Sequence, residues 1–294
     1  MSLNKPIWKL RDWIDKSRLN YYNISLNPKS IDYLKKHKKI IKWGFLCENS
    51  EGIEIIEKNK NKIIWSWLSS NPNAIKILKE NPEKIDFGEL SKNPNAIEIL
   101  EKNKDKINWC ELSRNPNAIK LLEENPDKID WYELSRNPNA IQILEENPDK
   151  INWCQLSFNP NAIQILEKNK DKINWNYLSA NPNAIHLLLQ NKHFIEWSYL
   201  SGNPNAIELL EKNKDKIDYF ELSNNPNAIE LLKKNKNKID WINISLNPSI
   251  FELDYEEMKK NNKEIEEELI KEVMEPSRVF KNGGINYLKE LFGD

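Results

Sequence analysis

The side chains of this sequence that could bind a metal ion or act as nucleophiles are few and scattered. They are three histidines and three cysteines: His37, His186, His193, Cys47, Cys110 and Cys154. Only His186 and His193 lie near each other, and we find no cysteine or carboxylate at a spacing that would complete a metal site. The sequence also contains no glycine-rich phosphate loop, nucleophile elbow or HExxH motif. It therefore predicts a protein that is not an enzyme and that uses no cofactor or metal ion.

Pairs of lysines recur along the chain and could form a basic edge that binds nucleic acid. They are Lys104/Lys106, Lys170/Lys172, Lys214/Lys216 and Lys236/Lys238. RNA-binding proteins that read one base per repeat have this general format. However, aspartates stand between the lysines of the first three pairs, and the net charge of the chain is only −1. Solvated loop charge is the preferred interpretation, and nucleic-acid binding is kept as an alternative.

A set of apolar and aromatic residues could instead bind another protein. Between about residues 155 and 202, side chains that are charged in neighbouring segments become apolar or aromatic. Exposed aromatic clusters often mark interaction sites. We therefore predict a protein-binding patch to which six residues contribute: Phe158, Tyr177, His186, Leu189, Phe194 and Tyr199. The alternative is that drift produced these substitutions and that they pack on one another. The pattern leaves open whether all six share one surface.

These residues are set in a repeat that dominates the sequence. The phrase Asn-Pro-Asn-Ala-Ile returns every 22 residues from Asn71 to Asn225, and weaker copies extend the phase from Asn27 to Asn247. A fixed period of this length is the signature of a stacked-repeat solenoid. The Asn positions bound ten complete repeats, and the unbroken phase predicts one elongated body.

Each repeat contains two helix start signals. In residues 115–136, Asn115-Pro116 predicts the cap and first turn of a helix of about ten residues that Asn125-Pro126 ends. Asp130 then predicts a second cap, with Glu133 completing a capping box, and this helix ends near Arg136. The sequence thus predicts an all-α solenoid of helix–turn–helix repeats. A leucine-rich repeat is the alternative, but Ser135 and Pro138 interrupt the apolar alternation that its strand requires.

Stacking must hold these helices, because isolated helices below ~12–15 residues are marginal in water. An aromatic residue recurs once per repeat, from Trp43 to Trp241. At ~150–250 Å² of buried area per ring, this row predicts several kcal/mol of stabilisation per repeat and the main force that zips the units into a rod.

Atypical ends are expected of a solenoid because they cover its terminal apolar surfaces. Residues 1–26 are predicted to hold an N-terminal capping helix, over 5–17, and the segment leading into the array. Residues 27–250 form the repeat array, and residues 251–294 form a C-terminal helical cap and tail.

The sequence also indicates a compartment. Cys110 and Cys154 occupy equivalent repeat positions two repeats apart, roughly 20 Å in a solenoid, which is beyond the ~7 Å Cα limit for a disulfide. No apolar run resembles a signal peptide or a membrane span. Asn23-Ile-Ser25 and Asn243-Ile-Ser245 match the glycosylation sequon and are interpreted as accidental. We expect a protein that is not secreted and has no membrane association.

The repeat phrase resembles uncharacterised short-repeat proteins of giant DNA viruses that infect amoebae, relatives of mimivirus. The matching features are the NPNAI copies, segments such as residues 127–131, the Leu-Ser before each Asn-Pro, and residues 8–14 and 267–278. The resemblance covers nearly the whole chain and implies a viral protein of the host cytoplasm or virion, without implying an activity. The preferred function is a scaffold for protein–protein interaction, with an unknown protein partner. The alternatives are a nucleic-acid (RNA)-binding repeat protein and a structural component that self-assembles.

Overall fold

The computed structural model describes residues 5–262, and short helices follow one another through them. The chain divides into two units, residues 10–251 and the residues on either side of that range. Within residues 10–251 each 22-residue repeat forms two short helices joined by turns. The predicted all-α solenoid of helix–turn–helix repeats is confirmed.

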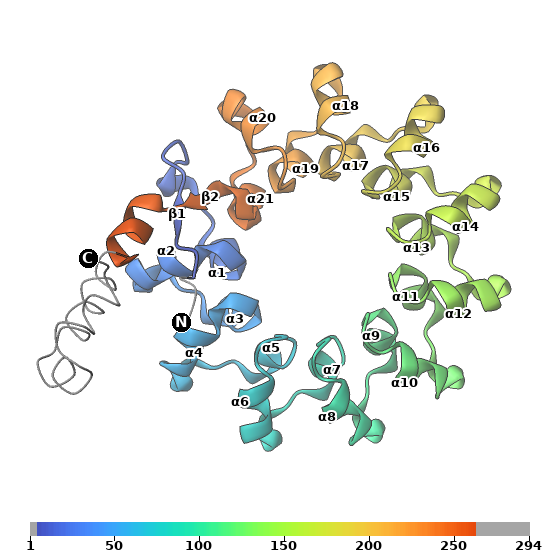
Figure 1. Ribbon diagram of the computed structural model, residues 1–294, viewed down its shortest axis with the longest axis horizontal. Helices are drawn as coiled ribbons and strands as arrows, with labels where there is room; N and C mark the ends of the chain where they lie inside the picture. Colours follow the sequence, from blue (N-terminus) through green and yellow to red (C-terminus); the bar gives the residue numbers. More distant parts are fainter. Residues whose placement is uncertain (1–4, 263–294) are drawn as a thin grey trace, which may run out of the picture. The chain divides into compact units, whose positions relative to one another are not determined.

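Two sets of α-helices alternate along the chain (Figure 1). The inner helices carry odd numbers and start at or next to the recurring aromatic residue: α1 (Tyr21–Leu26), α3 (Trp43–Glu48), α5 (Trp65–Ser69), α7 (Phe87–Leu90), α9 (Trp109–Arg114), α11 (Trp131–Arg136), α13 (Trp153–Phe158), α15 (Trp175–Ala180), α17 (Trp197–Gly202), α19 (Tyr219–Asn224) and α21 (Trp241–Leu246). The outer helices carry even numbers: α2 (Ile31–Lys36), α4 (Ile53–Glu57), α6 (Ile75–Glu80), α8 (Ile97–Glu101), α10 (Ile119–Glu123), α12 (Ile141–Glu146), α14 (Ile163–Lys168), α16 (Ile185–Gln190), α18 (Ile207–Lys212) and α20 (Ile229–Lys234).

Single turns of 3-10 helix connect these elements. They are η1 (Lys16–Arg18), η2 (Pro28–Ser30), η3 (Lys38–Ile40), η4 (Ser50–Gly52), η5 (Lys60–Lys62), η6 (Pro82–Lys84), η7 (Lys104–Lys106), η8 (Pro126–Lys128), η9 (Pro148–Lys150), η10 (Lys170–Lys172), η11 (Lys192–Phe194), η12 (Lys214–Lys216), η13 (Lys236–Lys238) and η14 (Pro248–Ile250).

The outer helices are shorter than predicted because the Asn-Pro-Asn-Ala segment forms a turn of its own. In residues 115–136 the Asn115 side chain accepts a hydrogen bond from the Asn117 backbone N–H at 3.0 Å, and α10 starts only at Ile119. The predicted helix of about ten residues is therefore wrong in length. The side-chain oxygen of Asn115 caps this turn, and the side-chain Nδ2 remains available for other hydrogen bonds.

The inner helices start where the sequence predicts, but their capping box is only half formed. The Asp130 side chain accepts hydrogen bonds from the backbone N–H groups of Tyr132 and Glu133 at 3.0 and 3.1 Å. The Asp130 N–H, which a full box would give to Glu133, donates instead to Ser113 Oγ of the preceding repeat at 3.0 Å. This exchange ties the cap of one repeat to its neighbour and explains the Ser that recurs before each Asn-Pro.

The core consists of leucine and small polar side chains, with the aromatic row at its margin. Leu122 of α10 and Leu134 of α11 are fully buried, and the same holds at the equivalent leucines of other repeats. Trp131 and Trp153 are only half-buried. The aliphatic side chains are the ones wholly removed from water, and the aromatic row adds partly buried rings beside them, so which of the two stabilises the stack more stays a prediction.

A buried row of asparagines, the Asn ladder, joins successive repeats. Its members are the Asn residues that open each repeat: Asn27, Asn49, Asn71, Asn93, Asn115, Asn137, Asn159, Asn181, Asn203, Asn225 and Asn247. Asn137 is typical: its Nδ2 donates to the carbonyls of Ser113 and Asn115 at 3.0 and 2.9 Å. One amide group thus satisfies carbonyls of the preceding repeat, which burial would otherwise leave unpaired.

Residues 10–251 close into a ring, which corrects the elongated rod predicted from the sequence. Figure 1 shows the inner helices following one another around the inside of this ring, with α1 beside α21. Asn27 Nδ2 donates to the carbonyls of Ser245 and Asn247, both at 3.1 Å, which is the Asn ladder continued from the end of the array to its beginning. The Asn20 N–H likewise donates to Ser245 Oγ at 2.9 Å. Eleven inner helices therefore complete the circle within the described chain.

Residues 5–17 do not form the predicted capping helix. Strand β1 (Trp8–Leu10) pairs with strand β2 (Phe251–Leu253) in a two-stranded sheet, and η1 follows. Within the ring unit, the Arg11 N–H donates to the Ile250 carbonyl at 2.9 Å. A cap is unnecessary because neither end of the array exposes a stacking surface. Residues 255–262 are helical, as expected, whereas the rest of the predicted C-terminal cap, from residue 263, lies outside the described residues.

Candidate functional site

Each inner helix has one side that packs against the rest of the ring and one side that faces the inside of the ring. In α15, Leu178 and Ser179 are buried against the rest of the ring. Since an α-helix turns 100° per residue, Tyr177 and Ala180 lie on the opposite side of α15. The equivalent positions of the other inner helices form the inner surface, and their side chains differ from repeat to repeat.

Three of the six predicted patch residues lie together on this inner surface. The rings of Phe158 and Tyr177 approach to 6.4 Å between centroids, and those of Tyr177 and Tyr199 to 5.9 Å, both edge-on. The Arg136 guanidinium stacks 4.2 Å from the Phe158 ring. Phe158, Tyr177 and Tyr199, here called the inner aromatic run, thus connect α13, α15 and α17.

The other three predicted residues lie elsewhere. His186 and Leu189 are exposed on outer helix α16, where His186 Nε2 lies 3.0 Å from the Glu167 carboxylate. Phe194 of η11 stacks on Trp175 at 4.7 Å. It takes the place of the lysines that lie over the aromatic ring of the preceding repeat elsewhere, as Lys172 lies over Trp153. The structure therefore divides the predicted patch into an inner and an outer subset.

Sequence reasoning missed further exposed apolar residues of the inner helices. Tyr22, Tyr132, Phe220 and Ile242 are each more than half exposed. All four are the second residue of an inner helix, where the other repeats carry small or polar side chains. Comparing that single position across repeats would have found them.

A hollow of about 340 Å³ opens beside the inner aromatic run. Inner helices α11 to α17 and their cap residues line it with Tyr132, Asn152, Cys154, Gln155, Asn174, Asn176, Tyr177 and Tyr199. None of these eight side chains carries a formal charge. Gln155, which is buried, donates from Nε2 to the Tyr132 hydroxyl at 2.6 Å and so holds that ring at the edge of the hollow.

The inner surface carries charged side chains in earlier repeats, after α7 and on α9. Lys92 Nζ lies 3.0 Å from the Glu89 carboxylate and 3.8 Å from that of Glu111. A hollow of about 350 Å³ there is lined by Lys92, Glu111 and Arg114, together with the Asn-Pro turn. The predicted change from charged to aromatic side chains along the array is thus a real difference between two parts of the inner surface.

All eight lysines of the four pairs are exposed, and at least one lysine of each pair contacts an aromatic ring. The second lysine of each pair lies over the aromatic ring of the preceding repeat: Lys106 over Phe87, Lys172 over Trp153, Lys216 over Trp197 and Lys238 over Tyr219, at 4.5–4.7 Å. Such cation–π contacts commit these ammonium groups to the fold.

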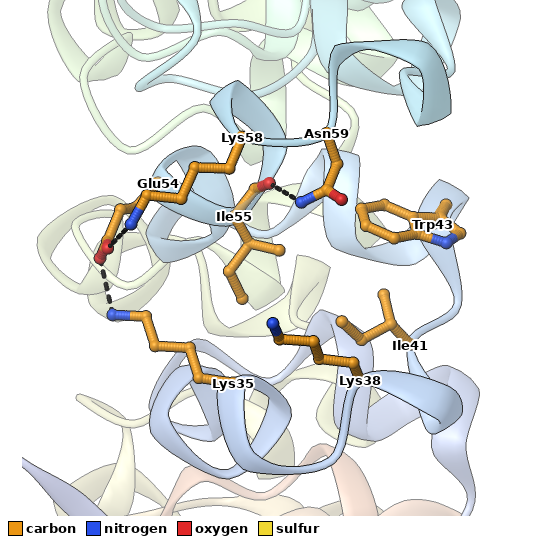
Figure 2. Close-up of a pocket in the computed structure, with 8 residues that line it drawn as sticks. All are labelled: Lys35, Lys38, Ile41, Trp43, Glu54, Ile55, Lys58 and Asn59. Atoms are coloured by element: carbon orange, nitrogen blue, oxygen red, sulfur yellow. Dashed lines mark hydrogen bonds and ion pairs between the residues drawn. The ribbon is translucent and has the colours of Figure 1, made fainter.

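Another hollow lies between outer helices α2 and α4 (Figure 2). It encloses about 430 Å³ over an apolar floor that includes Ile41, Ile55 and Trp43. Glu54 accepts hydrogen bonds from Lys35 Nζ at 2.6 Å and Lys58 Nζ at 2.8 Å, and these lysines lower the pKa of its carboxyl to about 2. The same arrangement recurs between α6 and α8, where Lys102 and Lys79 lower the pKa of Glu98 to about 2.

These carboxyls provide a pH test of the outer surface. Because the pKa of Glu54 is depressed from 4.5, its two ion pairs stabilise the fold above pH 4.5 and lose that contribution as the pH falls towards 2. We expect a midpoint of about 2 for Glu54 in a carboxyl NMR titration. Lys35→Ala should move the Glu54 midpoint upwards and leave that of Glu98 in place, and 1 M salt should raise both midpoints. A Glu54 midpoint near 4.5 at low salt would show that the ion pairs do not form.

Comparison with protein-family models finds a match over residues 33–193 to the family described as "Periplasmic copper-binding protein (NosD)". No curated protein matches the sequence, and no solved structure matches the chain. The matched region begins inside α2 and ends inside η11, so it consists of repeats alone.

Over residues 5–262 no group of three or more His, Cys, Asp or Glu side chains is placed to hold a metal ion. No helix in the same range combines the length and apolar character needed to cross a membrane. The match covers just over half of the sequence and on that ground places the chain in the NosD family, through its repeat region alone and with no copper-binding residues carried over.

Proposed function

We propose that this repeat protein is a non-enzymatic scaffold that binds a protein partner on the inner surface of its ring. The inner aromatic run carries this proposal. It joins three successive helices, Tyr199 is 40% exposed, and its members replace charged residues of earlier repeats. Aromatic side chains gain much from burial in an interface and lose little conformational freedom there.

Two observations favour a protein partner over the alternatives. The second lysine of each recurring pair lies over an aromatic ring, which weakens the case for nucleic acid. Self-assembly through the ends of the array would need free stacking surfaces there. The end helices α1 and α21 instead pack on each other, so their stacking surfaces are already covered. A scaffold of this kind is consistent with the resemblance to giant-virus repeat proteins, and we propose that it acts in an infected host cell or in the virion.

The double substitution Tyr177→Ser with Tyr199→Ser tests the inner surface. It removes two rings without disturbing the buried leucines of α15 and α17, so the ring should fold while retention of the partner from infected-cell extract falls at least tenfold, as expected when two aromatic anchors are lost. Quantitative mass spectrometry of pull-downs, with nuclease-treated and untreated arms, measures the effect.

The outer subset provides the matched control. His186→Ser with Leu189→Ser removes two exposed side chains from outer helix α16 and should leave partner retention unchanged. Loss of the partner in the outer variant alone would move the binding surface to the outside of the ring. Retention that nuclease or moderate salt abolishes would support the nucleic-acid alternative instead.

A further inference from the structure

The hollow beside the inner aromatic run has the size and lining of a ligand pocket. Its volume of about 340 Å³ lies within the ~300–1,000 Å³ typical of small binding sites. Tyrosine rings and carboxamides line it, whereas the hollow at Lys92 and Glu111 has ionised walls. An uncharged lining disfavours a charged ligand, because an ion would lose its hydration there without a partner of opposite charge.

Several polar atoms of this lining are free to meet a ligand. Asn152, the cap of α13, uses only its carboxamide oxygen, which accepts from the Gln155 N–H. Asn174, the cap of α15, uses both ends: its Oδ1 accepts from the Tyr177 N–H and its Nδ2 donates to Cys154 Sγ at 3.4 Å. Asn176 is exposed on α15 and has a donor and an acceptor to offer. A carboxamide presents the same donor and acceptor pair as a peptide group and can bond to one on both sides.

We propose that this hollow binds an uncharged aromatic side chain of a polypeptide, with Asn176 bonding to the adjoining main chain. The proposal rests on the proposed function and adds the chemistry that the partner must bring. The inserted ring packs against Tyr177 and Tyr199 from the side of the hollow, extending the edge-on contact that these two rings already make with each other. No basic side chain lines the hollow to receive a phosphate, and the nearby Arg136 guanidinium stacks on Phe158.

The cysteines of the chain allow a direct test. Cys154 lines the hollow and is exposed, Cys110 is exposed on α9 outside it, and Cys47 is buried. N-ethylmaleimide alkylation of the full chain, followed by mass spectrometry, reports occupancy at Cys154 with Cys110 as internal control. The probe is N-acetyl-L-tyrosinamide, which carries one neutral aromatic ring and two amide groups.

At a probe concentration of ~10 mM we expect Cys154 alkylation to slow about tenfold while Cys110 is unaffected, because a ligand of this size binds with a Kd on the order of 1 mM. Asn176→Asp should abolish the protection by placing a carboxylate in the hollow. Ser66→Asp, which makes the equivalent change on α5, should preserve it.

Three outcomes would overturn the proposal: no protection of Cys154, equal protection by the anion N-acetyl-L-tyrosine, or stronger protection by methyl β-D-glucopyranoside, which would indicate a sugar site. Failure here is distinguishable from failure of the proposed function. Partner retention that still depends on Tyr177 and Tyr199, without protection of Cys154, would leave the scaffold proposal standing and remove this one.

Discussion

Asn137→Ala should lower the free energy of unfolding of the ring by about 2–4 kcal/mol, the largest stability effect we expect from a single polar substitution. The Asn137 side chain is fully buried, donates two hydrogen bonds to carbonyls of the preceding repeat, and accepts one from the Asn139 N–H. Alanine replaces none of these bonds, so buried carbonyls lose their donor without gaining water. Guanidinium denaturation followed by circular dichroism and Trp fluorescence measures the change.

The same repeat offers a matched control. Asn125 Nδ2 donates a single hydrogen bond, to the Leu121 carbonyl at 2.8 Å, from a half-buried position. Asn125→Ala should therefore cost only about 0.5–1.5 kcal/mol, because water can replace the lost donor. Equal costs at the two positions would mean that the Asn ladder contributes no more than an ordinary surface hydrogen bond.

Local structure could be predicted from the sequence because its signals are local. The positions of the inner helices follow from cap residues such as Asp130, which bonds to backbone groups two and three residues away. The role of Asn137 could not be found in this way. Its side-chain Nδ2 donates to carbonyls 22 and 24 residues earlier. The preference for Asn before Pro as a cap explains only the bond that its Oδ1 accepts from the Asn139 N–H.

Ring closure escaped prediction for a different reason. A repeat period fixes which residues stack but not the small rotation between neighbours that sets the curvature of a solenoid. One feature of the sequence is nevertheless consistent with ring closure. The hexapeptide Asn-Ile-Ser-Leu-Asn-Pro occurs at residues 23–28 and again at 243–248, the two segments that meet where the ring closes. The sequons noted at both places belong to this shared segment.

The candidate site was predicted in part. The change from charged to aromatic side chains identified Phe158, Tyr177 and Tyr199, which do lie together, because equivalent positions of neighbouring repeats are always adjacent. His186 and Leu189 were grouped with them because they lie in a repeat that departs from the usual pattern, and they lie on an outer helix. The hollow could not be predicted, since it depends on side chain volumes from four successive units.

A chain with cysteines at residues 22 and 242 should form an intramolecular crosslink in high yield. Tyr22 and Ile242 are both more than half exposed on α1 and α21, and the Asn23 side chain donates to the Ile242 carbonyl at 2.8 Å. A bis-maleimide of ~10 Å, the distance between packed helix axes, therefore spans Tyr22→Cys and Ile242→Cys once Cys110 and Cys154 are replaced by serine. Peptide mass spectrometry identifies the product.

Tyr22→Cys paired with Tyr132→Cys is the control, because α1 and α11 lie on opposite sides of the ring (Figure 1). This pair should give no intramolecular product with the same reagent. A rod-shaped array would fail to crosslink in both cases.

A second measurement distinguishes a closed ring from an open array whose ends meet by chance. Asn27 makes, where the ring closes, the same hydrogen bonds that Asn137 makes within the array. Asn27→Ala should therefore cost as much as Asn137→Ala, whereas an open solenoid would leave Asn27 at a free end and make its loss nearly silent.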